Sequence, residues 1–72
     1  MKNRIKIIRA EQGLTQEKLA EKAGISRTTL AVIETEKAIP DGQTIAKLVR
    51  ALKVPANKIF YDFDVPQQEE TT

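Results

Sequence analysis

The spacing of apolar and small residues between Gln16 and Glu34 is the feature that most constrains the fold. One amphipathic helical stretch ends at Gly24, and another begins after Ser26, so that the turn between them has only about three residues. Ala20 is small enough to allow close approach of the two helices, and Gly24 can adopt the left-handed conformation of a helix end. The apolar residues that fill the wedge between the helices are Leu19, Ala23, Ile25, Leu30 and Ile33. The pattern predicts a helix-turn-helix.

The rest of the chain also has helical periodicity, interrupted by Gly and Pro, and predicts an all-α fold. Thr15 and Ser26 are N-cap candidates, because their hydroxyl groups can accept from the free N–H groups of a first helical turn. Pro40 and Asp41 are expected to open the fourth helix. Helices are expected over residues 2–12, 16–23, 26–35, 42–52 and 55–60.

The aromatic residues of the chain gather at its C-terminal end. Tyr61, Phe63 and Val65 alternate with acidic residues, which is the period of a short strand. An isolated strand does not hold itself together, so it should pair with another segment. We predict a homodimer contact formed by these three residues and by Ile7, which is expected on the outer side of the first helix. The alternative is that the tail covers the core of its own chain.

Composition limits the chemistry that the chain can perform. The 72 residues include no Cys and no His, which excludes the usual zinc sites, thiol chemistry and Ser-His triads. We therefore expect no enzyme activity, no metal and no cofactor. No apolar run is long enough to cross a bilayer, and the N-terminus does not resemble a signal peptide, so a cytoplasmic protein without a membrane partner is expected.

The charge is unevenly distributed along the chain. The net charge is +2, but residues 61–72 carry four acidic residues and no basic one, which leaves residues 1–60 at +6. A basic body suits a polyanionic partner, although ordinary solvated Lys and Arg on helices would give the same count. We expect a domain over residues 1–60 and an acidic tail over 61–72, which is partly ordered or dimer-forming at 61–65.

Several segments together resemble a known family. They are "IKIIRAEQGLTQEKLAEKAGISRTTLAVIE", Pro40, "IAKLVRALKV" and the closing "IF", and they cover about residues 3–60. The chain resembles the helix-turn-helix regulators of the phage Cro and repressor type, also called xenobiotic-response-element-like. The resemblance implies a compact five-helix bundle of the lambda repressor type, with helix 26–35 in the DNA major groove and helix 16–23 across the backbone. The alternative is a generic corner of two helices that only builds a core.

The resemblance also implies roles for individual residues. Gln16 looks like the family's glutamine that binds a phosphate at the start of the second helix. Arg9 and Glu34 match a pair that forms a partly buried salt bridge between the first and third helices. Arg27, the one cation of the third helix, is a candidate for a bidentate contact with guanine or for a phosphate contact. Ser26 is expected to act mainly as a cap.

The other candidates for DNA contact have short or solvated side chains. Thr28 and Thr29 suit a thymine methyl group or a phosphate, Val32 offers only methyl contacts, and Lys37 is a possible backbone contact. Thr28 and Val32 stand where the family commonly has a long polar and a basic residue. Glu36 replaces a usual Gly, which predicts a reshaped or strained turn.

The resulting functional hypothesis is a sequence-specific DNA-binding transcription regulator, a repressor more than an activator. A specific site needs a Kd of about 10⁻⁸ M, near 11 kcal/mol, and a single helix with Arg27 and two threonines supplies only part of that. A homodimer on a palindromic operator is therefore expected. The alternative is a protein-interaction module, such as an antitoxin-like or controller protein that captures a protein partner.

Overall fold

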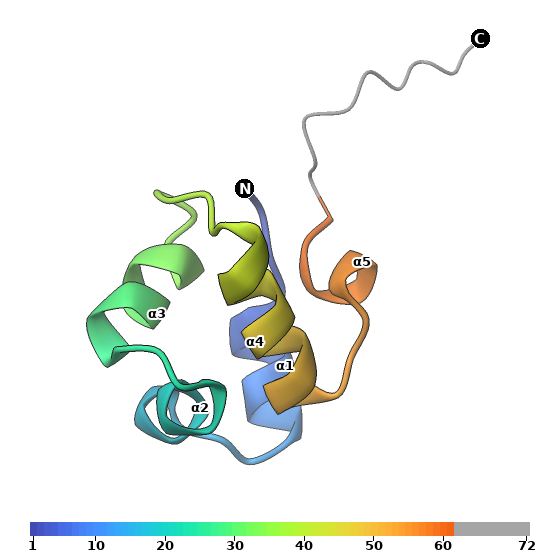
Figure 1. The fold of residues 1–72 in the computed structure, drawn as a ribbon. Coiled ribbons are helices and arrows are strands. Elements are labelled where there is room, and N and C mark those ends of the chain that lie inside the picture. The colour runs from blue at the N-terminus through green and yellow to red at the C-terminus, as the bar shows by residue number, and fades with distance from the viewer. Residues whose placement is uncertain (62–72) are drawn as a thin grey trace, which may run out of the picture.

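The computed structural model describes residues 1–61 of the chain, which fold into five helices around one core. Helices α2 and α3 lie on one side of the central pair α1 and α4, and α5 lies on the other side (Figure 1). Within the described residues, β pairing is limited to a single antiparallel bridge between Asn3 and Phe60. The helices are α1 (Ile5–Glu11), α2 (Gln16–Ala23), α3 (Arg27–Glu34), α4 (Gly42–Leu52) and α5 (Ala56–Ile59). The all-α, five-helix prediction is confirmed.

Every helix contributes to one apolar core. The periodic residues predicted to face inward on α2 and α3 are buried, and Ile59 and Phe60 close the core at the end of α5. None of the helices in the described part of the chain has the length and apolar character needed to cross a membrane. The buried apolar residues are Ile5, Ile8, Leu19, Ala20, Ala23, Leu30, Ile33, Leu48, Ala51, Leu52, Ile59 and Phe60.

Side-chain caps set the starts of three helices. The Thr15 hydroxyl accepts from the Lys18 backbone N–H at 3.0 Å, and the Ser26 hydroxyl accepts from that of Thr29 at 3.0 Å. The carboxylate of Asp41 accepts from the Thr44 backbone N–H at 2.8 Å, and this bond holds the pKa of Asp41 below its usual value. The two predicted N-caps, Thr15 and Ser26, and the predicted opening of the fourth helix at Asp41 are confirmed.

The start of the first helix was predicted wrongly. Helix α1 begins at Ile5 rather than at residue 2, because Asn3 is used for long-range contacts. Its side-chain N–H₂ donates to the carbonyl of Ile33 at 2.9 Å, and its side-chain oxygen accepts from the Ile5 N–H at 3.1 Å. Asn3 also forms the bridge with Phe60, so the N-terminal segment is extended and joins α3 to the end of α5.

The predicted C-terminal strand lies mostly beyond the described residues. Tyr61, its first residue, donates its backbone N–H to the carbonyl of Lys2 at 3.3 Å. The guanidinium carbon of Arg4 lies 4.8 Å from the centre of the Tyr61 ring, a cation–π contact. Tyr61 thus lies beside the N-terminal segment of its own chain and remains 48% exposed. Phe63 and Val65 lie outside the described residues, and their dimer contact stays a prediction.

The turn after α3 has the strain that the sequence predicts. Glu36 has a φ of 67°, in the left-handed region where a side chain crowds the backbone. Glycine adopts this conformation without that cost. The prediction made from the replacement of a usual Gly by Glu36 is therefore confirmed.

We expect Glu36→Gly to stabilise the fold by about 0.5 to 1 kcal/mol, because relief of the left-handed strain exceeds the added freedom of the unfolded chain. Urea unfolding followed by circular dichroism measures the change. Glu36→Ala is the matched control, since it removes the same charge but keeps the Cβ, and its stability should stay close to that of the parent. Equal changes in the free energy of unfolding of the two variants would show that loss of the Glu36 side chain, and not relief of the backbone strain, causes the change.

Candidate nucleic-acid interface

Helix α3 has one buried face and one face open to solvent. Leu30 and Ile33 are buried, so the helix is fixed to the core along that side. The predicted contact residues at its N-terminal end, Ser26, Arg27, Thr28 and Thr29, are all exposed. The chain therefore presents the start of α3 as an accessible polar surface.

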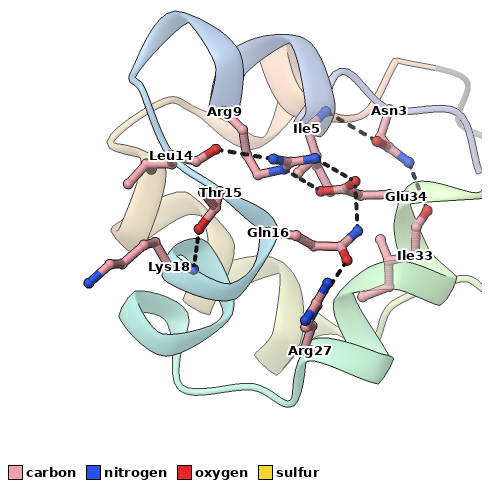
Figure 2. A network of polar contacts seen from close by, with 10 residues as sticks. All are labelled: Asn3, Ile5, Arg9, Leu14, Thr15, Gln16, Lys18, Arg27, Ile33 and Glu34. Atoms are coloured by element: carbon pink, nitrogen blue, oxygen red, sulfur yellow. Dashed lines mark hydrogen bonds and ion pairs between the residues drawn. The ribbon is translucent and has the colours of Figure 1, made fainter.

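A bidentate ion pair fixes the other end of α3. Arg9 on α1 donates through Nε to Glu34 Oε2 at 2.7 Å and through Nη2 to Glu34 Oε1 at 3.1 Å. Its third nitrogen, Nη1, donates to the carbonyl of Leu14 in the α1–α2 turn at 3.1 Å (Figure 2). The side chains of Arg9 and Glu34 are only 14% and 8% exposed. The predicted partly buried salt bridge is confirmed.

Gln16 connects this ion pair to the exposed end of α3. As the first residue of α2, it donates its side-chain Nε2–H to Glu34 Oε1 at 3.1 Å. Its Oε1 accepts from Arg27 Nε at 3.5 Å, the long limit of a hydrogen bond (Figure 2). Two predicted DNA-binding residues are thus brought together and linked to the core through Glu34. This link was not predicted from the sequence, in which its one local signal is that Gln16 and Arg27 each start a helix and the two helices are joined by a short turn.

Both threonines of α3 border a groove, but they differ in their hydrogen bonds. The Ser26 hydroxyl donates to the Thr29 hydroxyl at 2.8 Å, so both groups are engaged with the cap, as expected for Ser26. Thr28 and Val32 line a groove of about 450 Å³ between α3 and the segment that leads into α4. Ile39, on the other side of the groove, is 76% exposed and was not singled out from the sequence.

Two other predicted residues lie apart from this constellation. Lys37 is exposed in the segment between α3 and α4, with no side-chain hydrogen bond or ion pair found for it among the described residues. Ile7 is 60% exposed on α1 and lines a separate hollow of about 270 Å³ with Val54, Arg4 and Lys58. The structure therefore separates the predicted DNA-binding residues from the predicted dimerisation residue on α1.

Comparison with known proteins gives a consistent result. A helix-turn-helix family model matches residues 5–59. The chain is 36% identical over 61 residues to the uncharacterized HTH-type transcriptional regulator YgzD of Bacillus subtilis, covering 85% of this chain and 92% of that protein. It is 39% identical over 67 residues to the immunity repressor protein of Bacillus phage phi105, covering 93% of this chain and 46% of the repressor.

Solved structures with the same fold include two regulatory proteins. The restriction-modification controller protein C.AhdI from Aeromonas hydrophila superposes with a TM-score of 0.74 at 30% identity, covering 79% of this chain and 86% of that one. The N-terminal DNA binding domain of SinR from Bacillus subtilis gives a TM-score of 0.70 at 36% identity, covering 75% of this chain and 80% of that domain. The resemblance noted from the sequence is confirmed.

Removal of either partner of the Arg9–Glu34 pair should destabilise the fold strongly. We expect Glu34→Leu to lower the free energy of unfolding by about 3 kcal/mol, because it strands the nearly buried Arg9 charge. The double variant Arg9→Met/Glu34→Leu should recover much of this loss, since no unpaired charge remains. Denaturant unfolding of Glu34→Leu, of Arg9→Met and of the double variant gives the coupling energy between the two residues. If the double variant lost as much unfolding free energy as the two single variants together, the pair would not be coupled. Glu21→Gln, at an exposed position, is the neutral control.

Proposed function

The chain belongs to the helix-turn-helix family of DNA-binding transcription regulators, and we propose that it acts as a repressor on a palindromic operator that it binds as a homodimer. The observation that carries this proposal is the exposed start of α3, with Arg27 joined through Gln16 and Glu34 to the core. A contact surface held in this way loses little side-chain freedom when DNA binds.

Helix α3 enters the major groove with its N-terminal residues at the base edges, and α2 crosses the phosphate backbone. Gln16 stands at the positive end of α2, where a side-chain N–H₂ and free backbone N–H groups bind a phosphate. Arg27 then makes the specific contact, through two nitrogen donors to O6 and N7 of guanine. Thr28 contacts a base edge, and Lys37 contacts a phosphate of the backbone.

A homodimer is proposed because one copy of this surface offers few direct base contacts. Two copies on half-sites about 34 Å apart double the phosphate and base contacts, and impose the two-fold symmetry of the protein on the operator. Ile7 and Tyr61 supply the contact between copies, together with Phe63 and Val65. Their support is that Ile7 and Tyr61 are 60% and 48% exposed, although both are large apolar or aromatic side chains.

A module that only captures a protein partner is the less favoured function. One solved relative is a complex of the SinR protein with the SinI protein, at 36% identity to this chain. The sequence relatives, however, carry the names of transcription regulators and of an immunity repressor. We therefore propose that any protein partner binds in addition to DNA rather than in its place.

Selection from genomic DNA, followed by titration of the selected operator at several salt concentrations, tests the DNA-binding proposal. We expect a palindrome and a clear fall of log K with log salt, because bound phosphates release counterions. A slope near zero without an enriched palindrome would refute the proposed function.

Two variants separate the roles of the paired side chains. Arg27→Ala should lose about 1 to 3 kcal/mol of discrimination at one base pair of each half-site. Gln16→Ala should weaken binding to all operator variants, because it removes a phosphate contact, and it should lower the discrimination by Arg27 only in part, because the hydrogen bond between the two side chains is long at 3.5 Å. Equal loss across all variants for Arg27→Ala would move this residue to the phosphate contacts.

The dimer contact is tested on the exposed side chain of α1. Ile7→Asp should shift the chain from dimer to monomer in sedimentation analysis, with little loss of monomer stability because the residue is 60% exposed. A chain that ends at Phe60 should behave in the same way, since it lacks the aromatic tail. The matched control is Lys22→Asp on α2, which introduces the same acid at an exposed position remote from Ile7 in sequence. A dimer that persists in both altered chains would exclude this contact.

A further inference from the structure

We infer that the Asp41–Gly42 junction is a covalent modification site, at which the chain converts spontaneously to isoaspartate when the first turn of α4 opens. The folded chain protects this site through the N-cap of α4. The modification is independent of the proposed binding of DNA.

Asp41 is the one aspartate of the chain that precedes a glycine, since those at positions 62 and 64 precede larger residues. Glycine has no Cβ that hinders approach of its backbone nitrogen to the carboxyl group of the residue before it. Asp41 and Gly42 are both exposed, and a Cβ placed at position 42 would have no neighbouring atom within 4 Å. The two reacting residues are therefore next to each other and accessible to water.

The reaction requires no partner other than water. The backbone nitrogen of Gly42 forms a bond to Cγ of Asp41, and the hydroxyl of the carboxyl group leaves with the proton of that nitrogen as water. Water then adds to the main-chain carbonyl carbon of Asp41 in the cyclic imide and breaks the bond from this carbon to the nitrogen. The main chain afterwards runs through Cβ and Cγ, and the overall composition is unchanged.

The fold opposes the first of these steps in two ways. Ring closure needs Cβ of Asp41 and the nitrogen of Gly42 to be nearly eclipsed about the Cα–C bond, whereas the ψ of 174° keeps them staggered. The carboxylate also accepts from the Thr44 backbone N–H at 2.8 Å. Hydrogen bonding from Thr44, and after it the charge of Lys47, holds the pKa of Asp41 below its usual value. The protonated carboxyl group, from which hydroxyl leaves, is therefore scarce at neutral pH.

The reactive geometry is reached only in the fraction of molecules in which the first turn of α4 is open. Opening breaks the cap hydrogen bond and frees both the backbone angle and the carboxyl group of Asp41. The rate of conversion should therefore follow the stability of this turn.

Conversion should destabilise α4. Isoaspartate adds one atom to the main chain and moves the carboxylate, so that it no longer accepts from Thr44 as an N-cap. Helix α4 supplies the buried residues Leu48, Ala51 and Leu52 to the core. Asp41 and Thr44 also line the groove beside α3. The converted chain should therefore unfold at a lower temperature and have an altered groove wall.

Incubation of the full chain, folded and in urea, tests the inference. Trypsin then releases residues 38–47, in which Asp41 is the one acidic residue and no Asn occurs. Isoaspartate is measured in this peptide by a chromatographic shift without change of mass, and by methyl transfer from labelled S-adenosylmethionine with an isoaspartyl methyltransferase. We expect conversion in urea, and conversion slower by at least about fivefold in the folded chain, the factor that corresponds to one side-chain cap.

Two variants assign the reaction to this junction. Gly42→Ala keeps Asp41 and its cap, and the open space around position 42 accommodates the added methyl group. It should lose most of the conversion in urea. Asp41→Ser keeps an N-cap hydroxyl but lacks the reacting carboxyl group, and it should show no conversion. Thermal unfolding confirms that both variants are folded, and it compares the parent with the converted chain isolated by chromatography.

Each outcome supports or overturns the inference. Absence of isoaspartate from residues 38–47 after incubation in urea would overturn it. Equal rates in the folded and the unfolded chain would do so too, since the cap would then protect nothing. Equal conversion in Gly42→Ala would show that the glycine does not determine the reaction. A converted chain with the Tm of the parent would exclude the expected loss of the N-cap.

Discussion

The bidentate ion pair between Arg9 and Glu34 is the interaction on which the orientation of α3 depends. The apolar contacts that hold α3 to the core are not directional, so they fix its position better than its rotation. The two parallel hydrogen bonds of a guanidinium and a carboxylate have a defined geometry. Because Arg9 also holds the carbonyl of Leu14, the same group fixes α1, the α1–α2 turn and the C-terminal end of α3 relative to one another.

The side-chain amide of Gln16 connects the ion pair to the exposed surface of α3. Glu34 accepts a hydrogen bond from Gln16, and Gln16 accepts one from Arg27. This series of hydrogen bonds begins at the nearly buried Glu34 and ends at Arg27, the first residue of α3. The opposite side of the helix has no comparable polar network among the described residues, and Thr28 and Val32 there border an apolar groove. In this chain α3 combines a cation that is hydrogen-bonded to Gln16 on one side with an exposed apolar surface on the other.

The helix bounds that are set by residues close together in the sequence could be predicted from the sequence. The bounds of α2 and α4 were predicted correctly, because Thr15, Asp41 and Gly24 act through hydrogen bonds and backbone angles within one turn. The start of α1 was wrong, since the partners of Asn3 are Ile33, 30 residues away, and Phe60.

Contacts of the site that depend on tertiary approach were missed for the same reason. The amide of Gln16 meets Glu34 and Arg27 only after α1, α2 and α3 have packed together. An apolar residue in a connecting segment, such as Ile39, has no periodic neighbours that indicate whether it is buried or exposed. The segment that carries it is nevertheless held at both ends, by the left-handed Glu36 after α3 and by buried Pro40 before the Asp41 cap. The left-handed residue Glu36 thus lies where the chain turns from α3 to form the opposite wall of the groove.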